Sequence, residues 1–349
     1  MLGSAKGVAV KCVHYQIAQC VTGRGARRTS SVGGLVTARR PARSTRGRRE
    51  SYGELVGAEL CERGRVGLPM QRKASRDSRQ SAIMTQLPRD STEELALLCP
   101  PHAQPITARL AGAGSLRREL EALLAAAPPG ASPVLFRDLL LNANAAGKAS
   151  AAARMWAWKR LKLRYVLDPA VPEFRAFVGS MQETTSPSER GLLCFLMFAR
   201  TDRLLREVTL ECVSPALSRE GTVIQPDGIQ ASILDHARAS SLRWSAITIR
   251  RAASHLLAAL KDFGVLQGSA TKRTVRPQPG PMVVTFAARL ARLQGLTDRQ
   301  TLEAQWFRLL GLTVEQVVNL FYAATRSGTL EFRMQADVVE ISLPQVPAV

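Results

Sequence analysis

Two stretches of the chain collect lysine and arginine with almost no acid to balance them. Between Asp138 and Asp168 there is no acidic residue. Between His236 and Thr297 the only acid is Asp262, against ten lysines and arginines. Clustered cations repel one another unless an anion is near, and these side chains are the usual partners of nucleic-acid phosphates. Both stretches therefore predict surfaces that bind a polyanion.

The second stretch divides into two faces when it is placed on a helix that begins near Ser245 and ends at Gly264. At 100° per residue the apolar side chains gather on one side, namely Ile249, Ala253, Leu256, Leu260 and Phe263. The other side gathers Arg250, Arg251, Ser254 and Lys261. The apolar side should pack while the basic side faces out, so we favour contact with DNA over an uninvolved solvated face.

Residues beside this helix extend the expected contact. Lys272, Arg273 and Arg276 follow in a loop or hairpin, where they would touch phosphate like the wing of a winged helix. Ser245 and Thr248 bring hydroxyl and backbone N–H groups to the start of the helix, and such groups suit phosphate oxygens.

The first stretch forms another helix-turn-helix candidate, because its cations occupy a turn and the helix after it. They are Lys148, Arg154, Lys159, Arg160, Lys162 and Arg164, and we include them among the expected DNA-binding residues. The alternative is a solvated helix face whose aliphatic stems cover Trp156, Trp158 and Leu161. The tryptophans fall on different faces of the helix, so angular placement leaves both interpretations open.

An enzyme is the poorer interpretation of this sequence. The four histidines have no nucleophile at a familiar spacing, and the GxSxG, Walker and HExxH motifs are absent. Asp235 and His236 are adjacent, so on a helix they point about 100° apart and form no dyad by themselves. The six cysteines include no CxxC pair, which argues against zinc. We expect no catalytic residue, cofactor, metal or small-molecule substrate.

Charge and composition separate residues 1–90 from the rest of the chain. The formal net charge is +20, and residues 1–90 hold 18 lysines and arginines against 6 acids. This segment mixes Gly, Ser, Arg and Pro without periodicity, so we expect a disordered basic N-terminal extension, which an upstream-extended reading frame before Met84 would also explain. The 46% hydrophobic content leaves enough apolar material for a large core in the remainder.

Capping signals predict a series of helices after residue 115. Ser132 before Pro133, Ser150, and Ser186 before Pro187 each begin one, and two capping boxes pair Thr297 with Gln300 and Thr313 with Gln316. Residues 329–333 and 338–342 could form a hairpin. We therefore expect a mainly α, compact helical protein with winged-helix-like helix-turn-helix elements and one or two short β-hairpins, in regions 91–180 and 181–349.

Two further expectations concern location and the last helices. The longest apolar run, residues 192–199, is far shorter than the roughly 20 residues of a membrane span, so we expect a cytoplasmic protein without membrane contact. Residues 297–342 have the order helix, turn, helix, hairpin but carry mixed charge, which favours a packing or partner surface.

Three segments resemble the BrxA family of bacterial BREX phage-exclusion systems. They are residues 198–206, residues 244–266 with Lys272 after them, and residues 147–150 with the basic helix that follows. The resemblance runs from about Ser115 to the C-terminus and leaves out residues 1–90. It implies an all-helical protein with two helix-turn-helix elements, after Lys148 and after Ser245, that binds DNA alongside a methyltransferase and other defence proteins such as an ATPase.

The function expected from these observations is a non-catalytic accessory protein that binds double-stranded DNA mainly through phosphates. Two alternatives stay open. One is a helical scaffold or adaptor that joins defence proteins without touching nucleic acid, and the other is an RNA-binding helical domain.

Overall fold

A computed structural model describes residues 100–345 of the chain, so the expected N-terminal extension lies outside the described residues. Two short 3-10 helices come first, η2 (Pro101–Ala103) and η3 (Ala108–Gly112). Four helices follow: α2 (Arg117–Ala126), α3 (Pro133–Leu141), α4 (Ala151–Tyr165) and α5 (Pro172–Glu183). Ser132 and Ser150 cap α3 and α4, as predicted, by accepting hydrogen bonds from Leu135 N and Ala153 N.

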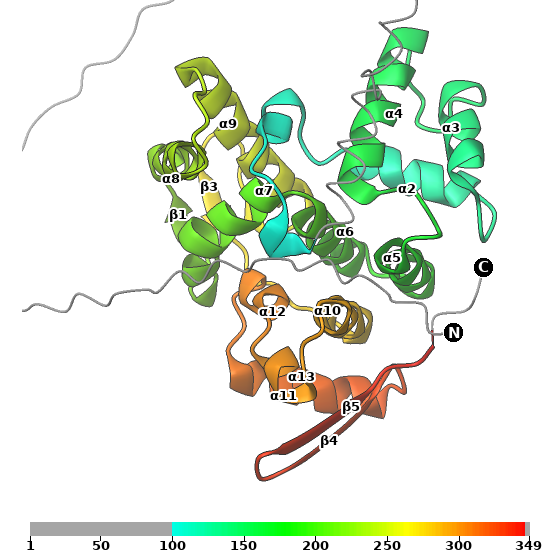
Figure 1. Cartoon of the computed structure of the whole chain (residues 1–349), viewed down its shortest axis with the longest axis vertical. Helices are drawn as coiled ribbons and strands as arrows, with labels where there is room; N and C mark the ends of the chain where they lie inside the picture. Colours follow the sequence, from blue (N-terminus) through cyan, green and yellow to red (C-terminus); the bar gives the residue numbers. More distant parts are fainter. Residues whose placement is uncertain (1–99, 346–349) are drawn as a thin grey trace, which may run out of the picture. The chain divides into compact units, whose positions relative to one another are not determined.

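The centre of the molecule is α6 (Pro187–Thr201), which Ser186 caps. Every residue from Gly191 to Thr201 is buried, so this helix is surrounded by protein (Figure 1). The chain then breaks at Asp202 and continues through α7 (Arg203–Val208), the π-helical turn η4 (Thr209–Val213) and the 3-10 helix η5 (Ser214–Ser218). Asp202 causes the break by capping α7, because its Oδ1 accepts from Leu205 N at 3.0 Å.

A small three-stranded sheet and two helices form the next unit. They are β1 (Val223–Ile224), α8 (Pro226–Ala239), α9 (Ala246–Asp262), β2 (Leu266–Gln267) and β3 (Lys272–Thr274). All strand pairs are antiparallel, and β3 lies between β1 and β2.

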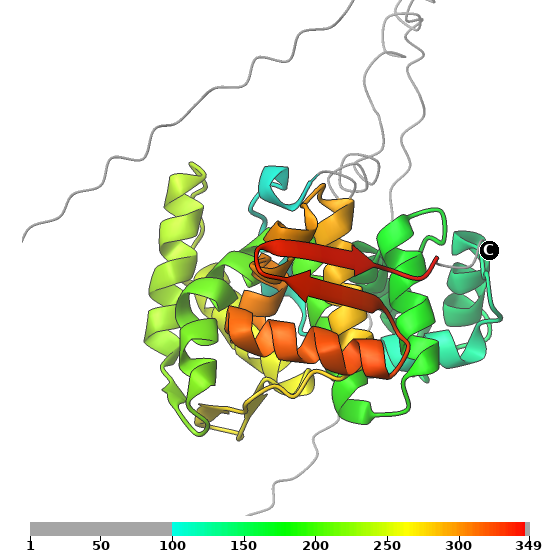
Figure 2. The same cartoon turned by 90° about the horizontal axis from the view of Figure 1, so that it is seen from below.

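The last unit contains α10 (Pro281–Leu293), α11 (Asp298–Leu302), α12 (Gln305–Leu309), α13 (Val314–Arg326) and the hairpin of β4 (Glu331–Gln335) and β5 (Val338–Ser342). Figure 2 shows the hairpin beside α13 and α11, which it contacts. Both predicted capping boxes are present, at Thr297 and Thr313. The predicted hairpin is confirmed, although its first strand begins two residues later than expected.

One hydrophobic core joins α2 to α13 with η3, β1, β2 and the hairpin of β4 and β5. The buried cluster runs from Ile106 to Ile341, and the rings of Phe177 in α5 and Phe286 in α10 lie 5.9 Å apart. The regions on either side of residue 181 therefore contribute to the same core. The prediction of a mainly helical protein with a few short antiparallel strands is confirmed.

Among residues 100–345, no helix combines the length and the apolar character that crossing a lipid bilayer requires.

Candidate nucleic-acid interface

The second cation-rich stretch lies in the unit built from β1, α8, α9, β2 and β3. Residues 240–245 join α8 to α9, and Leu242 N donates to Ala237 O at 2.8 Å to close the turn. The order along this unit is strand, helix, turn, helix, hairpin, and in Figure 1 α8 and α9 lie together beside the sheet. We call the hairpin of β2 and β3 the wing, after its place in the predicted winged-helix-like element.

Helix α9 begins and ends where the sequence predicts. Ser245 caps it by accepting from Thr248 N at 3.2 Å, and Gly264 takes a positive φ of 81° just after it. The predicted apolar face is buried, from Ile249 to Phe263. The predicted division of the helix into two faces is therefore confirmed.

The opposite face of α9 presents uncompensated charge to solvent. Arg250, Arg251, Ser254 and Lys261 are all exposed, as expected. Within residues 100–345 the guanidinium groups of Arg250 and Arg251 form no ion pair and no hydrogen bond. Ile247 also lies on this face with 60% of its surface exposed, and it was missed by the sequence analysis. Its spacing of three and four residues from the two arginines is the signal that could have found it.

Two cationic side chains of the wing donate hydrogen bonds to backbone carbonyl groups. Lys272 Nζ donates to Gly268 O at 3.0 Å and to Ser269 O, and Arg273 Nη1 donates to Gly221 O at 3.0 Å. Arg276 is exposed after β3. Gly268 has a φ of 96°, and a Cβ there would collide with Thr271 O, so this tight turn requires glycine. These hydrogen bonds therefore fix the side chains of Lys272 and Arg273 against the backbone of the hairpin and of Gly221.

The hydroxyls at the start of α9 are committed to its cap. Ser245 Oγ and Thr248 Oγ1 lie 3.0 Å apart, and Ser245 Oγ also accepts from Thr248 N. These two hydroxyls therefore hold the start of the helix in place.

Helix α9 is fastened to the N-terminal part of the molecule along its length. His255 Nδ1 lies 2.8 Å from Leu110 O in η3, and Asp262 Oδ2 accepts from Ser115 Oγ at 2.6 Å. Arg117 Nη1 donates to Asp262 O at 2.8 Å. Asp262, the only acid of the stretch, therefore faces the N-terminal helices and leaves the exposed arginines uncompensated.

The first cation-rich stretch is less open than the sequence predicts, and Arg164 must be removed from the expected surface. Arg164 is 2% exposed, donates through Nη2 to Ala113 O at 2.7 Å, and lies 5.0 Å from the centre of the Phe198 ring. Burial lowers the pKa of its guanidinium to about 10, so it is still charged at neutral pH. A side chain enclosed in this way supports the packing of α4 and cannot reach a phosphate.

The other cations of this stretch are only partly available. Lys148 Nζ pairs with Glu119 Oε1 at 2.5 Å, and the guanidinium of Arg160 packs against Gly112. Arg154, Arg160 and Lys162 are half-buried, which leaves Lys159 as the exposed member of the six. Figure 1 shows η3, in cyan, between α4 and α9. The structure gathers the α9 and wing cations in one unit and keeps the α4 cations in another.

The groups that could suggest an enzyme are differently arranged. His236 Nε2 lies 3.3 Å from Glu211 Oε2, and Ser232 Oγ donates to the same oxygen at 2.6 Å. Glu211 thus separates the serine from the histidine, whereas a serine nucleophile needs the histidine as its direct base. Cys194 is fully buried, and burial raises the pKa of its thiol far above its usual range, which makes it a poor nucleophile.

Asp202 has Arg200, Arg203 and Arg206 close to it in the sequence, which would suggest an ion-pair cluster. Instead Arg200 pairs with Glu173 at 2.6 Å, and Arg206 donates to the carbonyls of Ala199 and Pro101. Burial raises the pKa of Asp202, and its Oδ2 has no hydrogen-bond partner within the described residues. At 3% exposure this carboxyl supports the fold and is closed to a substrate.

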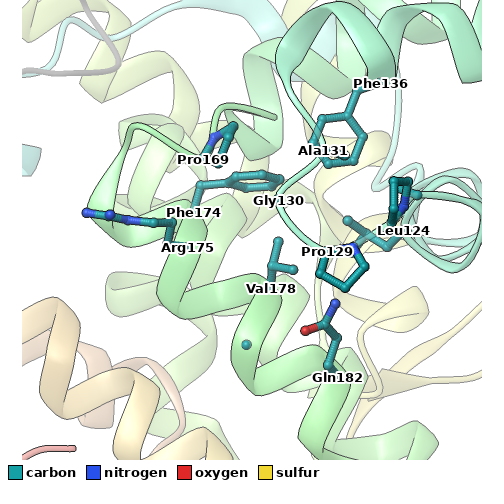
Figure 3. Close-up of a pocket in the computed structure, with 13 residues that line it drawn as sticks. Leu124, Pro129, Gly130, Ala131, Phe136, Pro169, Phe174, Arg175, Val178 and Gln182 are labelled. Carbon is teal, nitrogen blue, oxygen red and sulfur yellow. The ribbon is translucent and has the colours of Figure 1, made fainter. Parts of the chain in front are cut away.

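An apolar pocket of about 360 Å³ opens between the α2–α3 turn and α5 (Figure 3). Phe136, Phe174 and Val178 line it together with Leu124 and Pro129, and Gln182 contributes an amide. The side chain of Arg175 extends away from it in Figure 3. This lining contains no carboxylate, histidine, thiol or hydroxyl, so it offers no acid, base or nucleophile for catalysis.

Comparison with known proteins agrees with the resemblance seen in the sequence. No curated protein matches the chain. The model of the BrxA family matches residues 107–290, which hold η3, the helices α2 to α9 and the wing. This match covers just over half of the sequence, and the chain therefore belongs to the BrxA family of BREX phage-defence proteins.

Proposed function

We propose that this protein is a non-catalytic DNA-binding member of its BREX system. The exposed face of α9 and the wing β2–β3 would hold a duplex, mainly through its phosphates. The observation that carries the proposal is the state of Arg250 and Arg251, which are exposed on a well-packed helix and have no acidic partner within residues 100–345. Phosphates would supply the missing negative charge.

Duplex DNA suits this face better than RNA does. With 17 residues α9 is about 25 Å long, and it projects as a helix backed by core. The major groove of B-form DNA is about 12 Å wide and admits a helix, whereas the deep and narrow major groove of A-form RNA does not. A competition experiment between duplex DNA and duplex RNA separates the two possibilities. Stronger competition by the RNA would favour RNA binding.

Charge reversal tests the proposed face. The double variant Arg250→Glu, Arg251→Glu should weaken duplex binding and flatten its salt dependence, since each lost phosphate contact removes roughly one unit of the slope of log K against log salt. Fluorescence anisotropy across a salt titration measures both quantities.

The matched control is Arg326→Glu, Arg333→Glu, which makes the same change in net charge at exposed arginines of α13 and β4. It should leave the affinity close to that of the parent. Equal losses in the two variants would mean that net charge, and not this face, attracts DNA.

The C-terminal unit favours a second role beside DNA binding. Val314, Tyr322 and Val338 are large apolar residues with 46%, 39% and 65% of their surface exposed, and the charges around them are mixed. These exposed side chains support an adaptor role toward other defence proteins, with a methyltransferase or an ATPase as the proposed partner, acting in the cytoplasm. Co-purification that survives nuclease treatment would support it, and loss on nuclease treatment would leave DNA as the link.

A further inference from the structure

The exposed face of α9 differs from a simple phosphate-binding surface in its composition. Its first turns present Ile247, Arg250, Arg251 and Ser254. Ile247 is 60% exposed at the N-terminal end of this cationic face, and an aliphatic side chain gains nothing from a phosphate. Single exposed apolar residues are common on protein surfaces, so the position of Ile247 matters more than its exposure. It stands three and four residues before the two arginines, which places all three on the same side of the helix.

The spacing of these residues matches a short run of base pairs. The helix rises 1.5 Å per residue, so the stretch from Ile247 to Ser254 covers roughly 10 Å. Successive base pairs are stacked about 3.4 Å apart, so this stretch spans about three of them. In winged-helix and helix-turn-helix proteins the N-terminal part of the recognition helix reaches the base edges. The four residues lie within the first half of α9.

The residue types also fit the hydrogen-bonding groups and the methyl group that base pairs present in the major groove. An arginine fork donates two hydrogen bonds to O6 and N7 of guanine, and aliphatic carbon packs on the C5 methyl group of thymine. A serine hydroxyl can form a hydrogen bond with either a donor or an acceptor on a base edge. Neither arginine is held by another protein group in the described part of the chain, so their forks are free to form bidentate pairs with a base.

We infer that the first turns of α9 read base edges in the major groove of duplex DNA. Arg250 or Arg251 pairs with guanine, and Ile247 packs against the methyl group of a neighbouring thymine. This inference rests on the proposed function and deepens it, because phosphate contacts would supply most of the affinity and this face would supply the sequence preference. The recognised element is a short step that contains guanine and thymine.

Base analogues test each contact without changing the protein. Selection from a pool of random duplexes with the full-length protein should first yield an enriched guanine- and thymine-containing step. Replacing that guanine by 7-deazaguanine removes the N7 acceptor, and replacing the thymine by deoxyuridine removes the methyl group. The first replacement should weaken binding about tenfold or more, as expected for a bidentate pair, and the second by a smaller factor.

Protein variants then assign the contacts to residues. Ile247→Ala should lower the preference for thymine over deoxyuridine to about one. Arg250→Lys or Arg251→Lys keeps the positive charge but loses the fork, so one of them should lose the preference for guanine over 7-deazaguanine. The matched control Arg326→Lys should keep both preferences. The quantity compared is the ratio of two dissociation constants for one variant, so a general loss of affinity or stability cancels.

The outcomes separate this inference from the proposed function. If the parent binds every duplex equally, and charge reversal of Arg250 and Arg251 still abolishes binding, the inference fails and the proposed function stands. If no duplex binds in a salt-dependent way, both fail. If a preference exists but survives in all three variants of α9, another part of the chain reads the sequence and the inference is wrong.

Discussion

Arginines of this protein lie in opposite environments, some buried in the core and others exposed to solvent. Arg164 is enclosed, lies over the Phe198 ring and supports the fold, whereas Arg250 is exposed and has no protein partner within residues 100–345. Arg164 is still charged at neutral pH, because even its lowered pKa, about 10, lies well above 7. Residue type alone therefore does not identify a binding residue, and the environment decides.

The difference between these two arginines also marks what the sequence could predict. The exposure of Arg250 follows from the spacing of Ile249, Ala253 and Leu256 around it, which is local information. The burial of Arg164 depends on α6 and on the segment around Ala113, which pack over it from positions more than 30 residues away. No pattern within α4 contains that information.

The buried carboxyl of Asp202 should make stability depend on pH. Its pKa is raised by burial from the usual 3.8, so above that pH the unfolded chain loses this proton while the folded chain keeps it. The folded state then binds more protons, and its stability falls as the pH rises through the window above 3.8. Asp202→Asn can still cap α7 but does not ionise, so it should gain stability relative to the parent as pH rises. Urea unfolding of both proteins at pH 4 to 7 measures this difference, and a difference independent of pH would contradict it.

At the scale of elements, the helix starts could be predicted from local capping residues, whereas strand pairing over long sequence distances could not. The starts of α3, α4, α6, α9, α11 and α13 all follow from Ser or Thr caps whose side chains accept backbone N–H groups. Helix α5 was not predicted, because Val171 at its start gives no side-chain cap. Strand β1 was also missed, since it has two residues and its partner β3 lies 49 residues further along the chain.

The close approach of α6 to the end of α9 can be tested with one methyl group. A Cβ on Gly191 would lie 2.6 Å from Phe263 O, which is backbone and cannot move aside easily. Gly191→Ala should therefore lower the free energy of unfolding by about 1–3 kcal/mol. In α5 a Cβ on Gly179 meets nothing within 4 Å, so Gly179→Ala should raise the free energy of unfolding by about 0.5–1 kcal/mol. Urea denaturation of the parent and of both variants measures the direction of each change in the free energy of unfolding. A Gly191→Ala variant that is more stable than the parent would show that the two helices are not this close.

At the scale of the whole molecule, the helical regions 91–180 and 181–349 of the sequence analysis contribute their described residues to one core. The two regions meet where Phe177 packs against Tyr165 and Phe286. Charge patterning could locate the candidate binding face, but it could not reveal that α5 and α10 would close this core. That contact joins residues more than 100 positions apart.

The shared core predicts that both regions unfold together. Phe177→Ala removes a fully buried ring and should cost about 3–5 kcal/mol. Hydrogen exchange followed by mass spectrometry in increasing urea should then show α4 and α12 losing protection at the same, lower concentration. Loss of protection in α4 alone, with α12 unchanged from the parent, would show that the two regions are independent domains.

The attachment of α9 to η3 and to Ser115 has a kinetic consequence. Because His255 and Asp262 already hold this helix against Leu110 and Ser115, a duplex would meet α9 in its final shape, and this helix would not have to order on contact. Complex formation would then proceed in one step, at a speed set by diffusion and by the attraction between the cationic face and the phosphates. Selectivity among duplexes would consequently arise in how long each complex lasts rather than in how fast it forms.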